Sequence, residues 1–151
     1  MSAMDPEQAY LAVLAFLEEQ WERTGRPDEL AMFLGPGQYT PGEGTSDPAM
    51  WWDWLAAIKQ VQTGIVTPDH RWLSLKPEDM ARMSAEQAYL AMVQYIDDYW
   101  KRVNRPAEMG ELLRLMRYTP GSGTADPSMW QSWLAVIDRV RRSQERRSGP
   151  R

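Results

Sequence analysis

Apolar side chains recur along the chain at intervals of three and four residues, which is the spacing of one face of an α-helix. One such stripe consists of Tyr10, Leu14, Leu17 and Trp21. A second stripe, richer in aromatic residues, consists of Met50, Trp51, Trp54, Leu55, Ile58 and Val61. No stretch of the sequence shows the sustained apolar–polar alternation of a strand. The pattern therefore predicts an all-α fold.

The chain is an ungapped tandem duplication. Residues Met4–Gly64 align with Met83–Ser143 at a constant offset of 79, and 28 of the 61 aligned positions are identical. Each copy is predicted to form three helices. Because a unit of about sixty residues buries too little surface to be comfortable alone, we expect the copies to pack as one bundle around an approximate two-fold axis. The predicted divisions are a first repeat at 1–64, a connector at 65–82, a second repeat at 83–143 and a basic, frayed tail at 144–151.

Capping residues mark the predicted helix starts. Asp5 precedes Pro6 and Asp47 precedes Pro48, so each pair combines a cap with a proline at the first helical position. In the second copy, Ser84 is followed three residues later by a glutamine, the spacing of a capping box. These signals place a helix start near residues 5, 47 and 84.

The middle helix of each copy is predicted to start at Pro27 and at the matching proline of the second copy. We expect it to stop early in the first copy, at the Gly-Pro-Gly of residues 35–37, whereas the second copy continues through residues 114–116. The Pro-Gly pair that follows at 41–42, and again in the second copy, fits the centre of a type II turn. The connector is expected to hold a helical turn or two.

The charge of the chain is divided unevenly between the copies. Residues 1–79 hold 5 Lys and Arg against 13 Asp and Glu, a net charge of −8. Residues 80–151 hold 12 against 8, a net charge of +4. This asymmetry suggests that the first copy faces something basic, although drift on a solvated surface gives the same pattern.

The sequence offers little for catalysis. It has no cysteine, and His70 in the connector is its one histidine, so thiol nucleophiles, zinc–thiolate sites and histidine-paired metal sites are excluded. The glycine-rich turn lacks the lysine of a phosphate loop, and an aspartate occupies the cap of the helix that follows. We therefore predict a protein that is not an enzyme and that has no cofactor and no metal.

Membrane and nucleic-acid partners are not favoured. No run of residues approaches the length of an apolar membrane span, and the N-terminal residues lack a secretory signal pattern, so we expect a cytoplasmic protein. The arginine-rich segment at 141–151 contains no interleaved aromatic residue, and the whole chain is acidic. Nucleic-acid binding is thus a minor alternative to a basic helix end.

Residues that differ between the copies are the better candidates for function, because a duplicated fold needs the same core twice. Trp52 is aligned with Gln131, and its neighbour Asp53 is aligned with Ser132. Trp52 lies about 100° around the helix from the apolar stripe, so it is expected to be half-buried. It is either an interface anchor or a contact to the other copy.

The first copy combines a tyrosine in its first helix with an Asp-Pro-Ala-x-Trp-x-Asp-Trp segment near its end; the residues are Tyr10, Asp47, Pro48, Ala49, Trp51, Asp53 and Trp54. This pattern resembles a family of small bacterial immunity proteins, which are encoded beside secreted polymorphic or contact-dependent toxins. The second copy keeps the aspartate, the proline and both tryptophans, but has Ser128 and Ser132 at two of these positions. The resemblance covers about forty residues of each copy and implies inhibition by occlusion, in which a rigid acidic surface docks on a toxin.

The leading functional prediction is therefore a non-catalytic binding protein, namely an immunity protein whose partner is a toxin domain with a basic surface. A structural or adaptor module that self-associates or scaffolds other proteins is the alternative. A solvated helix face is the simplest interpretation of the acidic residues on the first helix, and an acidic contact surface is the functional one. The predicted partner-binding residues are Glu18, Glu19, Glu22, Trp52 and Asp53.

Overall fold

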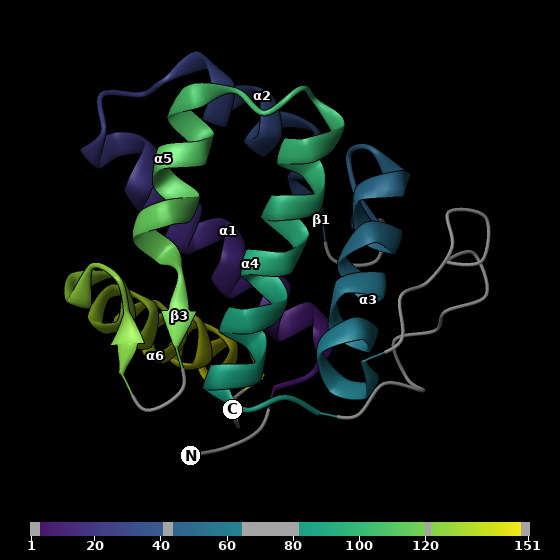
Figure 1. Ribbon diagram of the computed structural model, residues 1–151. Coiled ribbons are helices and arrows are strands. Elements are labelled where there is room, and N and C mark those ends of the chain that lie inside the picture. The colour runs from purple at the N-terminus through teal and green to yellow at the C-terminus, as the bar shows by residue number, and fades with distance from the viewer. Residues whose placement is uncertain (1–3, 41–43, 65–81, 120–121, 149–151) are drawn as a thin grey trace.

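Three helices and one short hairpin follow one another in the same order in each copy (Figure 1). The computed structural model describes residues 4–40, 44–64, 82–119 and 122–148. The helices of these ranges are α1 (Pro6–Arg23), α2 (Asp28–Gly37), α3 (Pro48–Thr63), α4 (Ala85–Arg102), α5 (Ala107–Met116) and α6 (Pro127–Ser148). The prediction of a helical fold is confirmed.

The predicted helix starts are confirmed, because the capping side chains make the expected hydrogen bonds. Asp5 and Ser84 each accept a hydrogen bond from the backbone N–H three residues on, and each is completed as a capping box by a glutamine. Asp47 accepts from the backbone N–H of Ala49 at 3.1 Å, and Asp126 accepts from that of Ser128 at 3.0 Å. These bonds satisfy N–H groups that a helix start otherwise leaves unpaired.

The prediction that the middle helix stops early in the first copy is wrong. Helix α2 continues through Pro36 to Gly37 and has the same length as α5. Proline removes only its own N–H, and the free carbonyl groups of this last turn find other donors. The side chain of Gln38 donates to the carbonyl of Leu34 at 3.0 Å, and the backbone N–H of Asp47 donates to that of Pro36 at 2.9 Å.

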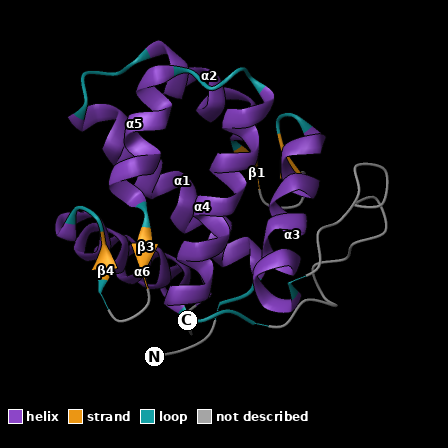
Figure 2. Cartoon of the chain, viewed as in Figure 1, coloured by secondary structure: helices purple, strands orange, loops and turns teal. Residues whose placement is uncertain are grey.

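Two short hairpins were not predicted. Strand β1 (Tyr39–Thr40) pairs antiparallel with β2 (Gly44–Thr45), and β3 (Tyr118–Thr119) pairs with β4 (Gly123–Thr124) in the same register (Figure 2). Strands of two residues are too short to show an alternating pattern. The predicted type II turns at 41–42 and 120–121, the connector helix and His70 lie outside the described residues.

The helices of the two copies interleave. Helix α3 packs along α4 and α1 packs along α6, so the first helix of each copy lies against the third helix of the other (Figure 1). Ahead of α1 and α4, Met4 and Met83 pair reciprocally, and each backbone N–H donates to the other residue's carbonyl at 2.7 and 2.8 Å. Helices α2 and α5 also touch. The buried side chains of both copies consequently belong to one core.

Residues shared by the copies hold this core with the same bonds. The indole N–H of Trp54 donates to the carbonyl of Pro6 at 3.0 Å, and Trp133 donates to that of Ala85 at 3.0 Å. Both tryptophans are fully buried, as predicted. The other four shared tryptophans are half-buried and pack against the core. Large aromatic side chains thus supply much of the buried area of a small structure.

Candidate protein-binding groove

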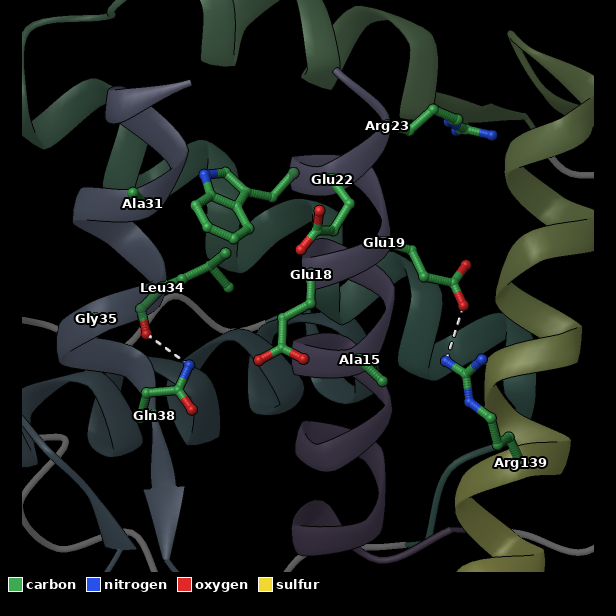
Figure 3. A pocket seen from close by; sticks show the side chains of 11 residues that line it. Ala15, Glu18, Glu19, Glu22, Arg23, Ala31, Leu34, Gly35, Gln38 and Arg139 are labelled. Atoms are coloured by element: carbon green, nitrogen blue, oxygen red, sulfur yellow. Dashed lines mark hydrogen bonds and ion pairs between the residues drawn. The ribbon is translucent and has the colours of Figure 1, made fainter. Parts of the chain in front are cut away.

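An open groove lies along α1, between α2 and α6 (Figure 3). It has a volume of about 910 Å³ and is lined by residues of α1, α2 and α6, together with Gln38. Its floor is apolar, with contributions from Ala15, Ala31 and Leu34. Small side chains on the facing surfaces of α1 and α2 leave this space open, because alanine and glycine fill little volume between two helices. A groove of this size can accept side chains of a partner.

The predicted carboxylates of the first helix meet at this groove (Figure 3). Glu18 and Glu22 lie on the side of α1 that faces α2, whereas Glu19 extends toward α6. The spacing of four residues places Glu18 and Glu22 on one helix face, one turn apart. The structure therefore brings these three predicted residues together.

Two of the carboxylates are already paired within the molecule. Glu19 forms an ion pair with Arg139 of α6 at 2.8 Å, and Glu22 forms one with Arg26 at 2.9 Å. Glu18 is exposed and makes no hydrogen bond or ion pair to any residue in the described part of the chain. Its carboxylate is thus an acceptor in the groove that remains free for a ligand.

Trp21 forms part of the groove wall and is held on two sides. Its indole N–H donates to the carbonyl of Pro27 at 3.2 Å, and the guanidinium of Arg26 lies 5.4 Å from its ring centroid. Trp100 repeats both contacts in the second copy, with Pro106 and Arg105. A fixed aromatic wall presents apolar area without losing conformational entropy on binding.

The second copy has a smaller counterpart of this groove. It has a volume of about 470 Å³, and Asp97, which is aligned with Glu18, lines it. Asp97 forms an ion pair with Lys101 at 2.9 Å, at the position aligned with Glu22. The second copy therefore has a lysine at the position where the first copy has the carboxylate of Glu22.

The other two predicted residues, Trp52 and Asp53, do not line the groove. Both belong to α3, which contributes no residue to it. The carboxylate of Asp53 is 18% exposed and pairs with Arg102 of α4 at 3.0 Å, and Trp52 is half-buried and packs against the core. The prediction of a half-buried Trp52 is confirmed, and Asp53 makes an internal contact between the copies.

Part of the charge asymmetry is balanced inside the molecule. Arg102 and Arg139 belong to the basic second copy, and their partners Asp53 and Glu19 belong to the acidic first copy. These pairs join helices that pack across the two copies, so opposite charges on the copies face one another. Arg139 was missed as a groove residue, because only the packing of α1 on α6 brings it there.

Metal-ligating clusters and membrane-spanning helices are both absent from the described part of the chain. Within it, no three or more His, Cys, Asp or Glu side chains gather as a metal ion would require. Its helices also lack the length and apolar character needed to cross a membrane. Comparison with known protein families, with curated proteins and with solved structures finds no match to this chain.

Proposed function

We propose that this chain is a protein-binding module that acts as an immunity protein and neutralises a toxin by covering it. Two repeat units around an approximate two-fold axis form the scaffold, and the groove beside α1 is the binding surface. The observation that carries the proposal is the free carboxylate of Glu18 in a groove with an apolar floor and a fixed aromatic wall.

The groove favours a basic side chain as its occupant. Lysine and arginine have long apolar stems that cover apolar surface and a charged head that seeks a carboxylate. Ala15, Ala31 and Trp21 offer the surface for the stem, and Glu18 offers the partner for the head. Because Glu22 already pairs with Arg26, we assign it a supporting role.

Helices form the walls of the groove, which suits tight binding. A surface whose backbone is already ordered loses little conformational entropy when a partner binds. Opposite charges raise the association rate by steering the encounter. The internal contacts of Trp52 and Asp53 support a role for both residues in joining α3 to α4, so we leave them out of the proposed binding surface.

The test is a binding titration against the product of the adjacent gene, at low and moderate salt. Glu18→Lys should slow association and weaken binding by about tenfold or more, because it places a like charge where a basic side chain docks. The expected loss should shrink as salt rises. Unchanged binding by Glu18→Lys would contradict the groove assignment.

A matched control is available in the second copy. Asp97→Lys makes the same charge change at the aligned position, and it should leave the affinity within about twofold once the general effect of net charge is allowed for. If the adjacent gene encodes no toxin-like protein, or its product does not bind, the adaptor alternative gains support. Equal losses from both variants would indicate non-specific attraction.

A further inference from the structure

A second cavity, of about 500 Å³, lies where the end of α1 and the first turn of α2 meet α5 and the start of α6. Its apolar wall is formed by Leu30, Met109, Leu112, Leu115 and Met129. Arg23 is the one residue that lines both this cavity and the α1–α2 groove. The volume is within the range of small-molecule sites.

The alignment of the copies explains why this cavity exists. At the equivalent place in the molecule, where the aligned helices of the opposite copies meet, Phe33 of α2 packs on Tyr99 of α4 with ring centroids 4.6 Å apart. Tyr99 is aligned with Gln20, and Phe33 is aligned with Leu112. Both Gln20 and Leu112 line the cavity. Gln20 and Leu112 thus have no ring at the positions that the rings of Tyr99 and Phe33 occupy in the equivalent place, which we call the aromatic end.

Gln20 lines the cavity, and its side chain holds an unused hydrogen-bond donor buried within the wall. The residue is 1% exposed, and its side-chain nitrogen Nε2 has no hydrogen-bond partner. Its oxygen Oε1 accepts from the guanidinium of Arg23, which can only donate, so the orientation of the amide is fixed. Buried donors without partners are rare in proteins because each one costs free energy. An acceptor from a bound molecule would satisfy Nε2.

The charges around the cavity disfavour an anionic ligand. Three carboxylates, those of Glu108, Glu111 and Asp126, line it beside the single guanidinium of Arg23. Glu111 pairs with Arg114 at 2.6 Å, and Asp126 caps α6. A ligand oxygen that carries a full negative charge would be repelled, whereas a hydroxyl or carbonyl oxygen would not.

We infer that this cavity binds a small aromatic molecule with an uncharged oxygen acceptor, of the phenol class. The ring lies against the apolar wall in the space that Tyr99 and Phe33 fill at the other end, and the oxygen accepts a hydrogen bond from Nε2 of Gln20. This site shares only Arg23 with the groove, and Arg23 has no part in the proposed function, so the two proposals succeed or fail separately.

The experiment uses p-cresol, which is the tyrosine side chain as a free molecule, with toluene and 4-methylbenzoate for comparison. Titrations of the full chain are followed by amide NMR. We expect p-cresol to shift the backbone signals of Leu112 and Met129 and the side-chain amide signal of Gln20. Toluene lacks the acceptor and should bind about tenfold more weakly. 4-Methylbenzoate should bind more weakly than p-cresol because of its charge.

Two variants separate the two parts of the inference. Leu112→Phe fills the cavity with the ring of the aligned residue and should weaken p-cresol and toluene alike, by about tenfold or more. Gln20→Leu keeps an apolar wall but removes the donor, so p-cresol should then bind no better than toluene. Gln131→Leu is the matched control, because it makes the same change as Gln20→Leu at an exposed residue of α6 that lines neither the cavity nor the groove, and it should change neither affinity.

Three results would overturn the inference. The first is the absence of shifts at the cavity residues with p-cresol, or shifts confined to the α1–α2 groove. The second is unchanged p-cresol binding by Leu112→Phe, which would place the ligand elsewhere. The third is an unchanged preference for p-cresol over toluene in Gln20→Leu, which would remove the donor from the site.

Discussion

The two ends of the interleaved bundle are made from aligned residues, but they are packed differently. At the aromatic end, Phe33, Tyr95 and Tyr99 form edge-on ring contacts with centroids 4.6 and 5.4 Å apart. At the cavity end, the aligned residues are Leu112, Phe16 and Gln20. One end is therefore closed by rings, while the other keeps a cavity of about 500 Å³.

The same contrast holds for the charged residues. At the aromatic end, Arg102 pairs with Asp53 at 3.0 Å. At the cavity end, the aligned residues are Arg23 and Ser132, and Arg23 instead donates to Gln20 and lies 3.8 Å from the sulfur of Met129. The cavity end thus has no carboxylate at this position, and its arginine lines the cavity wall.

This difference separates the positions that the fold requires from the positions that can vary between the copies. Trp54 and Trp133 make identical hydrogen bonds at the two ends, as do Tyr10 and Tyr89, so these residues hold the frame. The aromatic end shows that rings can close the space, and the cavity end shows that the frame survives without them. Positions where the copies differ are therefore where binding can evolve at the least cost in stability.

The largest predicted effect concerns the frame. Trp54→Ala and Trp133→Ala should each destabilise the protein by about 3–5 kcal/mol, because each empties a fully buried aromatic site. Trp52→Ala should cost less than half as much, since that side chain is half-buried. Denaturant melts of the three variants measure these losses. Equal losses for Trp52 and Trp54 would mean that the assignment of the buried and half-buried faces of α3 is wrong.

The next effect is on stability at high pH. Burial raises the pKa of Tyr10 from 10.0 to about 12, and it raises the pKa of Tyr95 well above its usual value. Asp53 adds to both shifts, while Arg102 opposes that of Tyr95. Because the folded state keeps these hydroxyls protonated, their contribution is complete below pH 10 and is lost as pH rises toward 12.

The loss from Tyr10 alone is roughly 2 kcal/mol, which a series of thermal melts from neutral to alkaline pH measures. At the cavity end, Phe16 has no hydroxyl to pair with Tyr89. Tyr95→Phe makes the aromatic end resemble the cavity end in this respect, and it should reduce the alkaline loss. An alkaline loss unchanged by Tyr95→Phe would show that this pair does not control it.

Local patterns were enough to predict much of the fold. The stripe through Trp54 identifies the buried helix face, and Asp5 and Asp47 identify helix starts, because both signals depend on residues within one or two turns. The end of α2 was mispredicted because Gln38 and Asp47 supply donors to its last turn from outside the helix. The short hairpins have too few residues to show a strand pattern.

The candidate site was only partly predictable for the same reason. Glu18, Glu19 and Glu22 share a helix, so helical periodicity brings them together. Arg139 joins them only through the packing of α1 on α6, which no local pattern encodes. The cavity at Gln20 is visible in the sequence as a difference between the copies, but its meaning depends on Leu112 lying opposite.

The third prediction exchanges the aligned residues Phe33 and Leu112 between the aromatic end and the cavity end. Phe33→Leu should destabilise the protein by about 1–2 kcal/mol, because it removes a ring from a filled site. Leu112→Phe should stabilise it by about 0.5–2 kcal/mol, because it fills an existing cavity. Thermal and denaturant melts compare the two single variants with the wild-type chain. Destabilisation by both variants would show that the cavity end is closed in solution.

The smallest effect concerns the ion pair. Asp53→Ser copies the residue of the cavity end and should cost about 0.5–1 kcal/mol at low salt, since Asp53 is only 18% exposed but Arg102 is 51% exposed. The cost should fall at high salt, which screens a partly exposed pair. Ser132→Asp is the reverse change and gives Arg23 a carboxylate partner. It should draw Arg23 from Gln20, which NMR would detect as a shift of the Gln20 side-chain amide. If the Gln20 signal does not move, Arg23 is held in place by Gln20 itself, and the missing carboxylate is not what frees it for the cavity.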